Sequence, residues 1–463
     1  KRFNSATLMR KVLLTFFLLS ICLSLTKALD RQGVRNILDP HLDEELMFYK
    51  YNITTEEFYA ILDYAQDHIY NTSAQPQPGL ICSSCLSTFK ILLTLKSEII
   101  LELLQFIGYE YCWLTRIQDF TVCKGAVEAM TPIIISSLAK HYLSPTRICP
   151  EIYLCNDYYK SLDLQAAINE TLKDKPKRDD PKPTGRETIK MLHISDVHVD
   201  FDYTPGMEAD CGEPLCCEKM HGPAKSMNSS AGIWGSLIYD CDLPPETAVQ
   251  ALRYIEDYLK PDFAVWTGDN VDHSIWRQSR EKNSFATLWM TNQMKSIFNQ
   301  TRMRVFPTDG NHECYPVNNF DFRSHREDSM KTAFSEAWKD WIGPDAAASV
   351  KKNAYYTSFY EKANLKIIGL ETNACDDGNY FLIENPTDPG HQLAWLHQEL
   401  LDAESKGQFV YLIGHHPTDG CMDQWARRYE AIVDRFNYTI RGQFFGHSHS
   451  DQWKVFYSQD RQT

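Results

Sequence analysis

Five short segments between Asp196 and His449 carry side chains that could hold metal ions. They offer carboxylate or amide oxygens and imidazole nitrogens, and they are Asp196–His198, Gly268–Asn270, Gly310–Glu313, Gly414–His415 and Gly446–His449. Such ligands suit hard-to-borderline cations, and two cations that share a carboxylate can activate water against an ester. The residue types therefore indicate metal-assisted hydrolysis.

Apolar runs precede four of these five segments directly. The runs are Met191–Ile194, Phe263–Trp266, Phe409–Ile413 and Gln443–Phe445. Short apolar runs bounded by Gly and Asp are typical of buried strands, and the carboxyl ends of successive parallel strands meet at one edge of a sheet. Between the first two segments, Pro245–Lys260 has a proline in its first turn and apolar residues at helical spacing. Strand, helix and strand in this order predict a layered α/β domain.

The bulk composition is that of a globular protein with room for two or three domains. The chain has 463 residues, of which 43% are hydrophobic and 23% charged, and its net charge is −14. A nucleic-acid-binding surface is usually basic, so this charge argues against a nucleic-acid partner.

The first 28 residues are predicted to be a secretory signal peptide. Arg10 and Lys11 precede the apolar run 12–25, and small residues lead to a cleavage site near Ala28. A transmembrane anchor is the alternative, but this run is shorter than the ~20 residues that span a bilayer.

Glycosylation sequons and cysteines agree with secretion, to the extracellular space or the lysosome. The sequons begin at Asn52, Asn71, Asn169, Asn228, Asn299 and Asn437. The 14 cysteines would then lie in an oxidising compartment and mostly form disulfides. Loss of Cys22 with the signal peptide leaves 13, so at least one thiol is expected to be unpaired.

The rest of the chain divides by composition. Residues 29–79 form an N-terminal extension, 80–158 a small helical module with six cysteines, 159–186 a proline-rich linker and 187–463 the α/β domain. The six cysteines of the module would form three bridges whose pairing the sequence leaves open. They are Cys82, Cys85, Cys112, Cys123, Cys149 and Cys155.

The cysteine spacing of this module resembles that of saposin B-type domains. The resemblance implies the nested pairs Cys82–Cys155, Cys85–Cys149 and Cys112–Cys123. It also implies lipid contact, and the many apolar side chains of so small a module are suited to a lipid surface. The alternative is that these side chains fill the interior of the helical bundle.

The five ligand segments, in this order, resemble the calcineurin-like metallophosphoesterases. Together with the saposin-like module, the stretch Thr387–Leu396 and the double cysteine Cys216–Cys217, the chain is similar to the acid sphingomyelinases from about Cys82 to Tyr457. The implied fold is a small all-α saposin domain followed by a four-layer α/β/β/α metallophosphoesterase sandwich.

The resemblance also implies roles for individual residues. Two Zn²⁺ ions are expected, one on Asp196, His198 and His449 and one on Asn311, His415 and His447, with Asp269 bridging them. A bridging carboxylate holds two cations ~3.5–4 Å apart, where a shared water is acidified to hydroxide. His312 would be the general acid for the leaving group, and His273 would contact the phosphate.

Disulfides in the α/β domain are implied in the same way. The pairs are Cys211–Cys216, Cys217–Cys241 and Cys375–Cys421. Cys314 has no expected partner, and Glu313 is expected to support the ligands rather than to bind metal.

The implied activity is hydrolysis of sphingomyelin in membranes to ceramide and phosphocholine, with the saposin domain presenting the lipid. One alternative is a secreted phosphodiesterase for another diester or a nucleotide. The other is a catalytically incomplete lipid-binding isoform, because acid sphingomyelinases continue with a cysteine-containing helical region that we expect to be truncated here after Thr463.

Overall fold

The computed structural model describes residues 105–106, 108–113, 115–141, 164–176, 185, 187–383 and 385–458. The chain forms two compact units, Lys1–Leu162 and Asp163–Thr463. No helix in these described ranges is both long and apolar enough to cross a membrane.

The described part of the first unit is helical. Helix α7 spans Phe120–His141, and a disulfide joins Cys112 to Cys123 as the saposin resemblance implies. The expected pairs Cys82–Cys155 and Cys85–Cys149 lie outside the described residues, as do the signal peptide, Asn52 and Asn71.

Two sheets form the centre of the second unit. The first contains parallel strands in the order β1 (Met191–Ile194), β2 (Phe263–Trp266) and β3 (Arg304–Pro307). The second has the order β4 (Tyr356–Tyr360), β5 (Leu365–Gly369), β6 (Phe409–Ile413) and β7 (Ile440–Phe444), and only β4 is antiparallel to its neighbour. The predicted runs at 191–194, 263–266 and 409–413 are thus strands.

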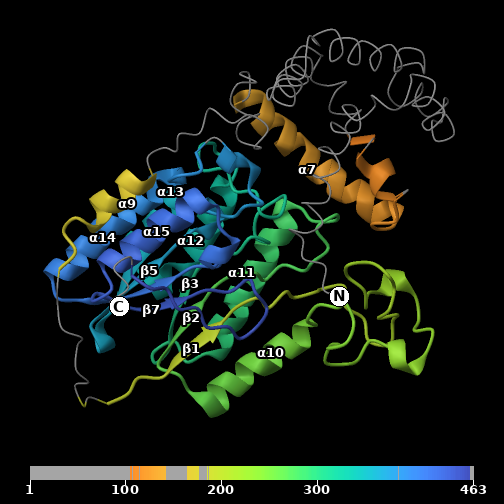
Figure 1. The fold of residues 1–463 in the computed structure, drawn as a ribbon. Helices are drawn as coiled ribbons and strands as arrows, with labels where there is room; N and C mark the ends of the chain where they lie inside the picture. Colours follow the sequence, from red (N-terminus) through yellow and green to blue (C-terminus); the bar gives the residue numbers. More distant parts are fainter. Residues whose placement is uncertain are drawn as a thin grey trace, which may run out of the picture. The chain divides into compact units, whose positions relative to one another are not determined.

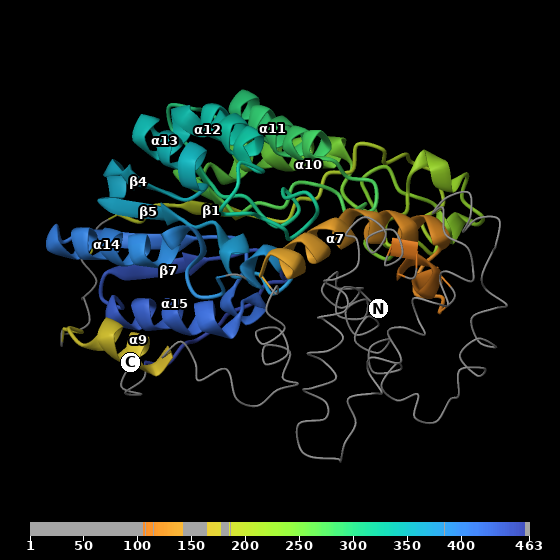
Figure 2. The same cartoon turned by 90° about the horizontal axis from the view of Figure 1, so that it is seen from above.

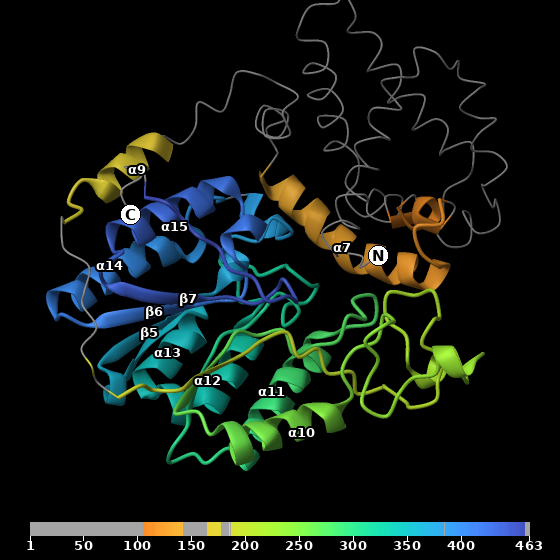
Figure 3. The same cartoon turned by 60° about the horizontal axis from the view of Figure 1, so that its bottom comes forward.

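Helices lie on both sides of these strands (Figures 1 and 2). On one side are α10 (Pro245–Tyr254), α11 (Arg280–Ile297), α12 (Asp328–Ile342) and α13 (Pro344–Asn353). On the other are α14 (Gln392–Ser405) and α15 (Asp423–Arg435). Figure 3 shows β5, β6 and β7 between α12 and α13 on one side and α14 and α15 on the other.

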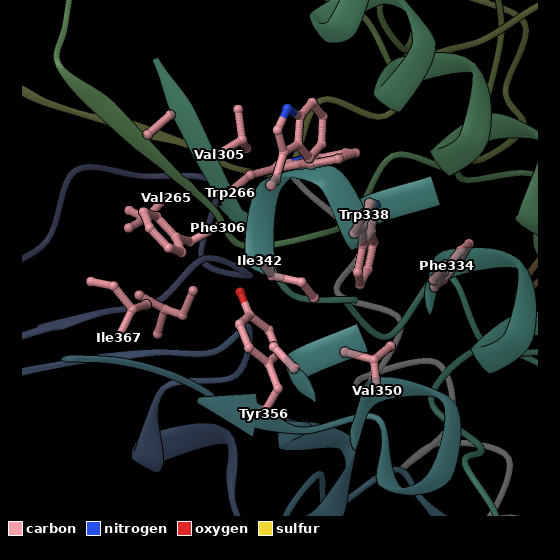
Figure 4. Close-up of a cluster of buried hydrophobic side chains, with 14 of the residues drawn as sticks. Val265, Trp266, Val305, Phe306, Phe334, Trp338, Ile342, Val350, Tyr356 and Ile367 are labelled. Carbon is pink, nitrogen blue, oxygen red and sulfur yellow. The ribbon is translucent and has the colours of Figure 1, made fainter. Parts of the chain in front are cut away.

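The interior explains why the central strands read as continuous apolar runs. One buried cluster joins the first sheet to the helices beside it and to Tyr356 and Ile367 of the second sheet (Figure 4). A second cluster packs Ile368 and Leu412 against α14 and α15. Since neighbouring residues of β5 face different clusters, this strand is buried on both faces, which favours an unbroken apolar sequence.

Local sequence sets the ends of several helices. The helix predicted over 245–260 begins at Pro245 as α10, and a π-helical turn, η4 (Ile255–Leu259), completes it. The Ser279 side chain caps α11 by accepting from the Lys282 N–H at 3.1 Å. Gly343, at φ 91°, ends α12 and lets α13 begin at Pro344. The short 3₁₀ helices are η2 (Lys219–His221), η3 (Met227–Ser229), η5 (Glu361–Ala363), η6 (Thr372–Ala374), η7 (Tyr380–Ile383), η8 (Pro389–His391) and η9 (Thr418–Gly420).

Part of the predicted linker is helical instead. Residues Leu164–Leu172 form α9, which packs on α15, and the Lys175 Nζ lies 2.7 Å from an Asp434 carboxylate oxygen. Apolar residues at 164, 168 and 172 lie on one helix face, and Ile168 is buried. The segment 159–186, predicted as a proline-rich linker, therefore contains a helix.

Candidate metal centre

All five ligand segments lie just after the carboxyl ends of strands. Asp196 and His198 follow β1, Asp269 follows β2, and Asn311 follows β3. The second sheet supplies three further residues, His415 after β6 and His447 and His449 after β7. The seven residues therefore come from both sheets and meet at one edge of each.

The segments Gly268–Asn270 and Gly310–Glu313 lie against each other with their backbones in close contact. A side chain at Gly268, whose φ is 83°, would overlap the backbone of Gly310, and one at Gly310 would overlap Asp269. Only glycine permits this approach. The glycines of these motifs therefore act in packing and leave ligation to the residues that follow them.

The first group of ligand atoms contains Asp196, His198, Asp269 and His449, all within 4.8 Å of one another. The Nε2 atoms of His198 and His449 are 3.1 Å apart, and His449 Nε2 is 3.4 Å from an Asp196 oxygen. His198 Nδ1 lies 2.7 Å from the Val271 carbonyl, so Nδ1 carries the proton and Nε2 presents its lone pair. This is the ring orientation that a metal ligand needs.

The second group gathers around the amide oxygen of Asn311. His415 Nε2 lies 2.8 Å and His447 Nδ1 3.1 Å from that oxygen. His415 Nδ1 faces the Thr267 carbonyl at 2.7 Å, which fixes its tautomer in the same way as in His198. The Asn311 amide nitrogen donates to Asn318 Oδ1 at 2.8 Å, and this bond turns the Asn311 oxygen toward the two histidines.

Asp269 lies between the two groups. Its Oδ2 is 3.1 Å from His415 Nε2 and 3.6 Å from His198 Nε2, while Oδ1 accepts the His312 backbone N–H at 2.9 Å. Burial alone would raise the pKa of this carboxyl, but the neighbouring histidines hold it well below its usual range. Asp269 is therefore a fixed, ionised carboxylate with one oxygen directed to both groups.

A bound cation suits this arrangement because lone pairs of ligand nitrogens and oxygens point toward one another. His415 Nε2 faces the Asn311 oxygen and an Asp269 oxygen, and His447 Nδ1 also lies 3.1 Å from the Asn311 oxygen. Burial alone would lower the pKa of His415, but Asp269 raises it to about 10. The negative field therefore favours a positive charge at Nε2, and a divalent metal ion satisfies the same atoms without a proton.

Backbone strain also concentrates here. Asp196, His198, Asp269, His447 and His449 have φ between 43° and 70°, and they are five of the twelve non-glycine residues with positive φ in the described ranges. Each costs about 1–3 kcal/mol, and such residues collect at functional sites. The fold thus holds five of the seven ligand candidates in the left-handed backbone region, which residues other than glycine rarely adopt.

Glu313 supports the site from beneath. Its Oε2 accepts from the backbone N–H groups of Asp269 and Gly310 at 3.0 and 2.7 Å. Its Oε1 accepts from the Asn270 backbone at 2.9 Å, the Asn270 side chain at 2.9 Å and Thr287 at 2.8 Å. With five donors around it, Glu313 connects the loops after β2 and β3.

His312 and His273 lie beside the first ligand group. The His312 ring is 4.9 Å from the His198 ring and 4.8 Å from the His273 ring, and its Nδ1 has no hydrogen-bond partner. Burial lowers the pKa of His312 to about 4. Burial would also lower the pKa of His273, but Asp242, 2.8 Å from its Nδ1, raises it to about 9. The pKa values of these neighbouring rings are therefore shifted in opposite directions.

Sequence reasoning assigned no role to three residues that the structure places near the site. Asn318 and Asp242 are separated from their partners in sequence and have no motif of their own. His416 is buried and its ring is 4.1 Å from the His447 ring. His193 lies on the edge strand β1 and is exposed, and its Nε2 lies 2.9 Å from Thr267 Oγ1.

The remaining predicted residues are cysteines and sequon asparagines. Disulfides join Cys211 to Cys216, Cys217 to Cys241 and Cys375 to Cys421, the pairs that the resemblance implies. Cys314 is buried, and it is the free cysteine of the described ranges. Three sequon asparagines are exposed and a fourth is half-buried, namely Asn169, Asn228, Asn299 and Asn437.

Fold and site together define an α/β protein with a histidine- and aspartate-rich centre for a divalent metal. The family model for calcineurin-like phosphoesterases matches residues 189–451. The chain belongs to this family.

Curated relatives that match more of the chain are sphingomyelin phosphodiesterases. Sphingomyelin phosphodiesterase B of Dictyostelium discoideum is 35% identical over 76% of this chain and 55% of its own length. Sphingomyelin phosphodiesterase of Bos taurus is 32% identical over 82% of this chain and 62% of its own length. Acid sphingomyelinase-like phosphodiesterase 3b of Mus musculus is 31% identical over 59% of each chain. The chain thus spans less than two thirds of the length of each of these relatives.

Proposed function

We propose that this protein hydrolyses sphingomyelin to ceramide and phosphocholine at a centre of two zinc ions. The observation that carries the proposal is the position of Asp269 Oδ2, 3.1 Å from His415 Nε2 and 3.6 Å from His198 Nε2, between two groups of ligand atoms. The names of the sphingomyelin phosphodiesterase relatives support the substrate.

In this proposal one ion is held by Asp196, His198 and His449, the other by Asn311, His415 and His447, and Asp269 is shared. Imidazole-rich ligation favours zinc over magnesium or calcium, which prefer oxygen ligands. When bound, the ions would polarise the phosphoryl oxygens and acidify a water held between them. The chain's own contribution is to fix the ligands before substrate arrives, through Asn318, Glu313 and the backbone carbonyls behind the histidines.

His312 is assigned as the acid that protonates the ceramide leaving oxygen. Its Nδ1 has no hydrogen-bond partner, and its backbone N–H donates to Asp269 Oδ1, so the residue is fixed beside Asp269 with one ring nitrogen available to a leaving oxygen. His273 is assigned to the phosphate oxygens because Asp242 keeps its ring protonated, and a cation there offsets the charge that develops on the phosphate. A positioned acid contributes ~10²–10⁴-fold to the rate.

We also propose that residues 80–158 form a saposin-type module that presents the lipid, and that the protein is secreted, to the extracellular space or the lysosome. Helix α7 and the Cys112–Cys123 disulfide support the first point. The exposure of Asn169, Asn228 and Asn299 supports the second, because glycans need surface positions. The two helical layers around paired sheets in Figure 2 support the four-layer sandwich.

The test is hydrolysis of sphingomyelin in anionic liposomes by the 463-residue protein at pH 5, with and without added zinc. Phosphocholine release that Asp269→Asn lacks would support the proposal. His312→Gln should keep its zinc and lose most of the rate. If the protein binds zinc and hydrolyses another phosphodiester but releases no phosphocholine from sphingomyelin, that other phosphodiester is the substrate. Zinc binding with no hydrolysis of either substrate would identify a lipid-binding protein with an incomplete site.

A further inference from the structure

A second group of potential ligands lies outside the centre just described. Oxygen atoms of Asp200, Asp202 and Glu218 are all within 4.8 Å of one another. Asp200 and Glu218 are each 1% exposed, whereas Asp202 is exposed. None of the three takes part in the chemistry proposed above, so the cluster needs its own explanation.

The backbone builds this cluster from two separate segments. Asp200 and Asp202 belong to the loop after β1, and Glu218 follows the double cysteine. An antiparallel bridge pairs Tyr203 with Glu218, and the Thr204 N–H donates to the Cys217 carbonyl at 2.9 Å. The disulfide between Cys217 and Cys241 fixes the second segment. The three carboxylates are therefore brought together by covalent and hydrogen-bonded structure rather than by chance flexibility.

Charge pairing around the cluster is incomplete. Arg277 donates to both oxygens of Glu218 at 2.6 and 2.8 Å. Two nearby acids outside the cluster also have cationic partners, because Lys282 Nζ is 2.9 Å from Asp272 and His273 Nδ1 is 2.8 Å from Asp242. Within the described ranges no lysine, arginine or histidine pairs with Asp200 or Asp202.

Asp200 supplies the independent sign of a ligand. Its Oδ1 accepts the Asp202 N–H at 2.8 Å, but its buried Oδ2 has no hydrogen-bond partner. A buried carboxylate oxygen without a donor is costly, and a bound cation removes that cost. The unpaired buried oxygen of Asp200, with the Asp202 carboxylate beside it, favours a bound divalent ion.

We propose that Asp200, Asp202 and Glu218 form a calcium site, separate from the histidine-rich centre. The ligands are oxygens only, which selects a hard cation, and calcium tolerates irregular geometry and fills its shell with carbonyls and water. The ion would join the loop that carries Asp196 and His198 to the disulfide-bonded segment Cys211–Cys241. Affinity on the order of 10⁻⁴–10⁻³ M is expected, as in extracellular calcium modules.

The experiment is a calcium titration of the zinc-loaded 463-residue protein by calorimetry, with terbium luminescence sensitised by Tyr203 as a second readout. One calcium ion per chain is expected. Asp202→Asn, an exposed substitution that leaves the interior intact, should weaken binding at least tenfold, and Asp200→Asn should abolish it. Asp210→Asn, an exposed acid of the same segment, is the matched control and should bind as the wild type does.

Two results would overturn the proposal. One is no calcium binding by the wild-type protein up to about 10 mM, well above the expected dissociation constant. The other is binding that survives Asp202→Asn and is lost in Asp269→Asn, since calcium would then occupy the histidine-rich centre. Calcium binding is measured without substrate, so its outcome is independent of the proposed hydrolysis.

Discussion

Replacing Glu313 with glutamine should loosen the loops that carry Asp269 and Asn311. The carboxylate accepts five hydrogen bonds, two at one oxygen and three at the other. An amide has only one oxygen, so its NH₂ group must face at least two N–H donors in either orientation. The substitution keeps the shape of the side chain and changes only its ability to accept.

The size of the expected loss in unfolding free energy follows from the hydrogen bonds that are lost. A hydrogen bond to a charged group is worth about 1.5–3 kcal/mol, so two lost bonds cost about 3–6 kcal/mol of unfolding free energy. With about 2 °C per kcal/mol for a domain of this size, the melting temperature should fall by about 6–12 °C. Zinc affinity should fall as well, by about 10–100-fold, because the loops no longer hold their ligands in place.

Thermal unfolding of the metal-free protein, followed by circular dichroism, measures the first effect, and competition with a chromophoric chelator measures the second. Glu336→Gln, on the exposed face of α12, is the control and should change the melting temperature by no more than 1 °C or so. Burial and then Asp269 raise the pKa of Glu313. If Glu313→Gln melts with the wild type, Glu313 is protonated in the fold, and the argument from five accepted bonds is wrong.

Three further predictions test other contacts. Asn318→Ala should free the Asn311 amide and weaken zinc binding by about 10–100-fold in a chelator competition, and unchanged affinity would show that Asn311 needs no orienting partner. Asp242 raises the pKa of His273 to about 9, above its unfolded value, so this pair stabilises the fold below about pH 6.5 and loses that effect as the pH rises through about 9. The melting temperatures of wild type and Asp242→Asn should therefore differ most near pH 6 and least near pH 10, and the reverse order would contradict the assignment. Ile168→Ala should cost about 2–4 kcal/mol in denaturant unfolding, because its buried side chain packs in the contact of α9 with α15, while the exposed control Glu170→Ala should have little effect.

The sequence predicted which strand ends bring the ligand candidates together, because the strand pattern and the residue types coincide there. Each of the strands β1, β2 and β6 is a short apolar run, and the residue types that follow are those that bind metals. Parallel pairing of these strands then brings segments that are distant in sequence to the same edge of a sheet.

Other features depend on contacts that no local pattern encodes. Asn318 orients Asn311 only because the chain turns back between them, and Asp242 meets His273 across a long separation in sequence. The split into two sheets, with β4 antiparallel, depends on packing between α13 and the strands. The prolines and charges that follow α9 led us to include this stretch in the linker, although its apolar residues have helical spacing.

Because the ligand candidates are divided between the two sheets, they are also divided between two parts of the polypeptide chain. Asp196, His198, Asp269 and Asn311 all precede the turn between α13 and β4, and His415, His447 and His449 all follow it. A cut at that turn would yield two fragments, each with an incomplete set of ligands and one sheet. Their reassembly should therefore respond to added metal, and a split version of this protein would act as a reporter of zinc.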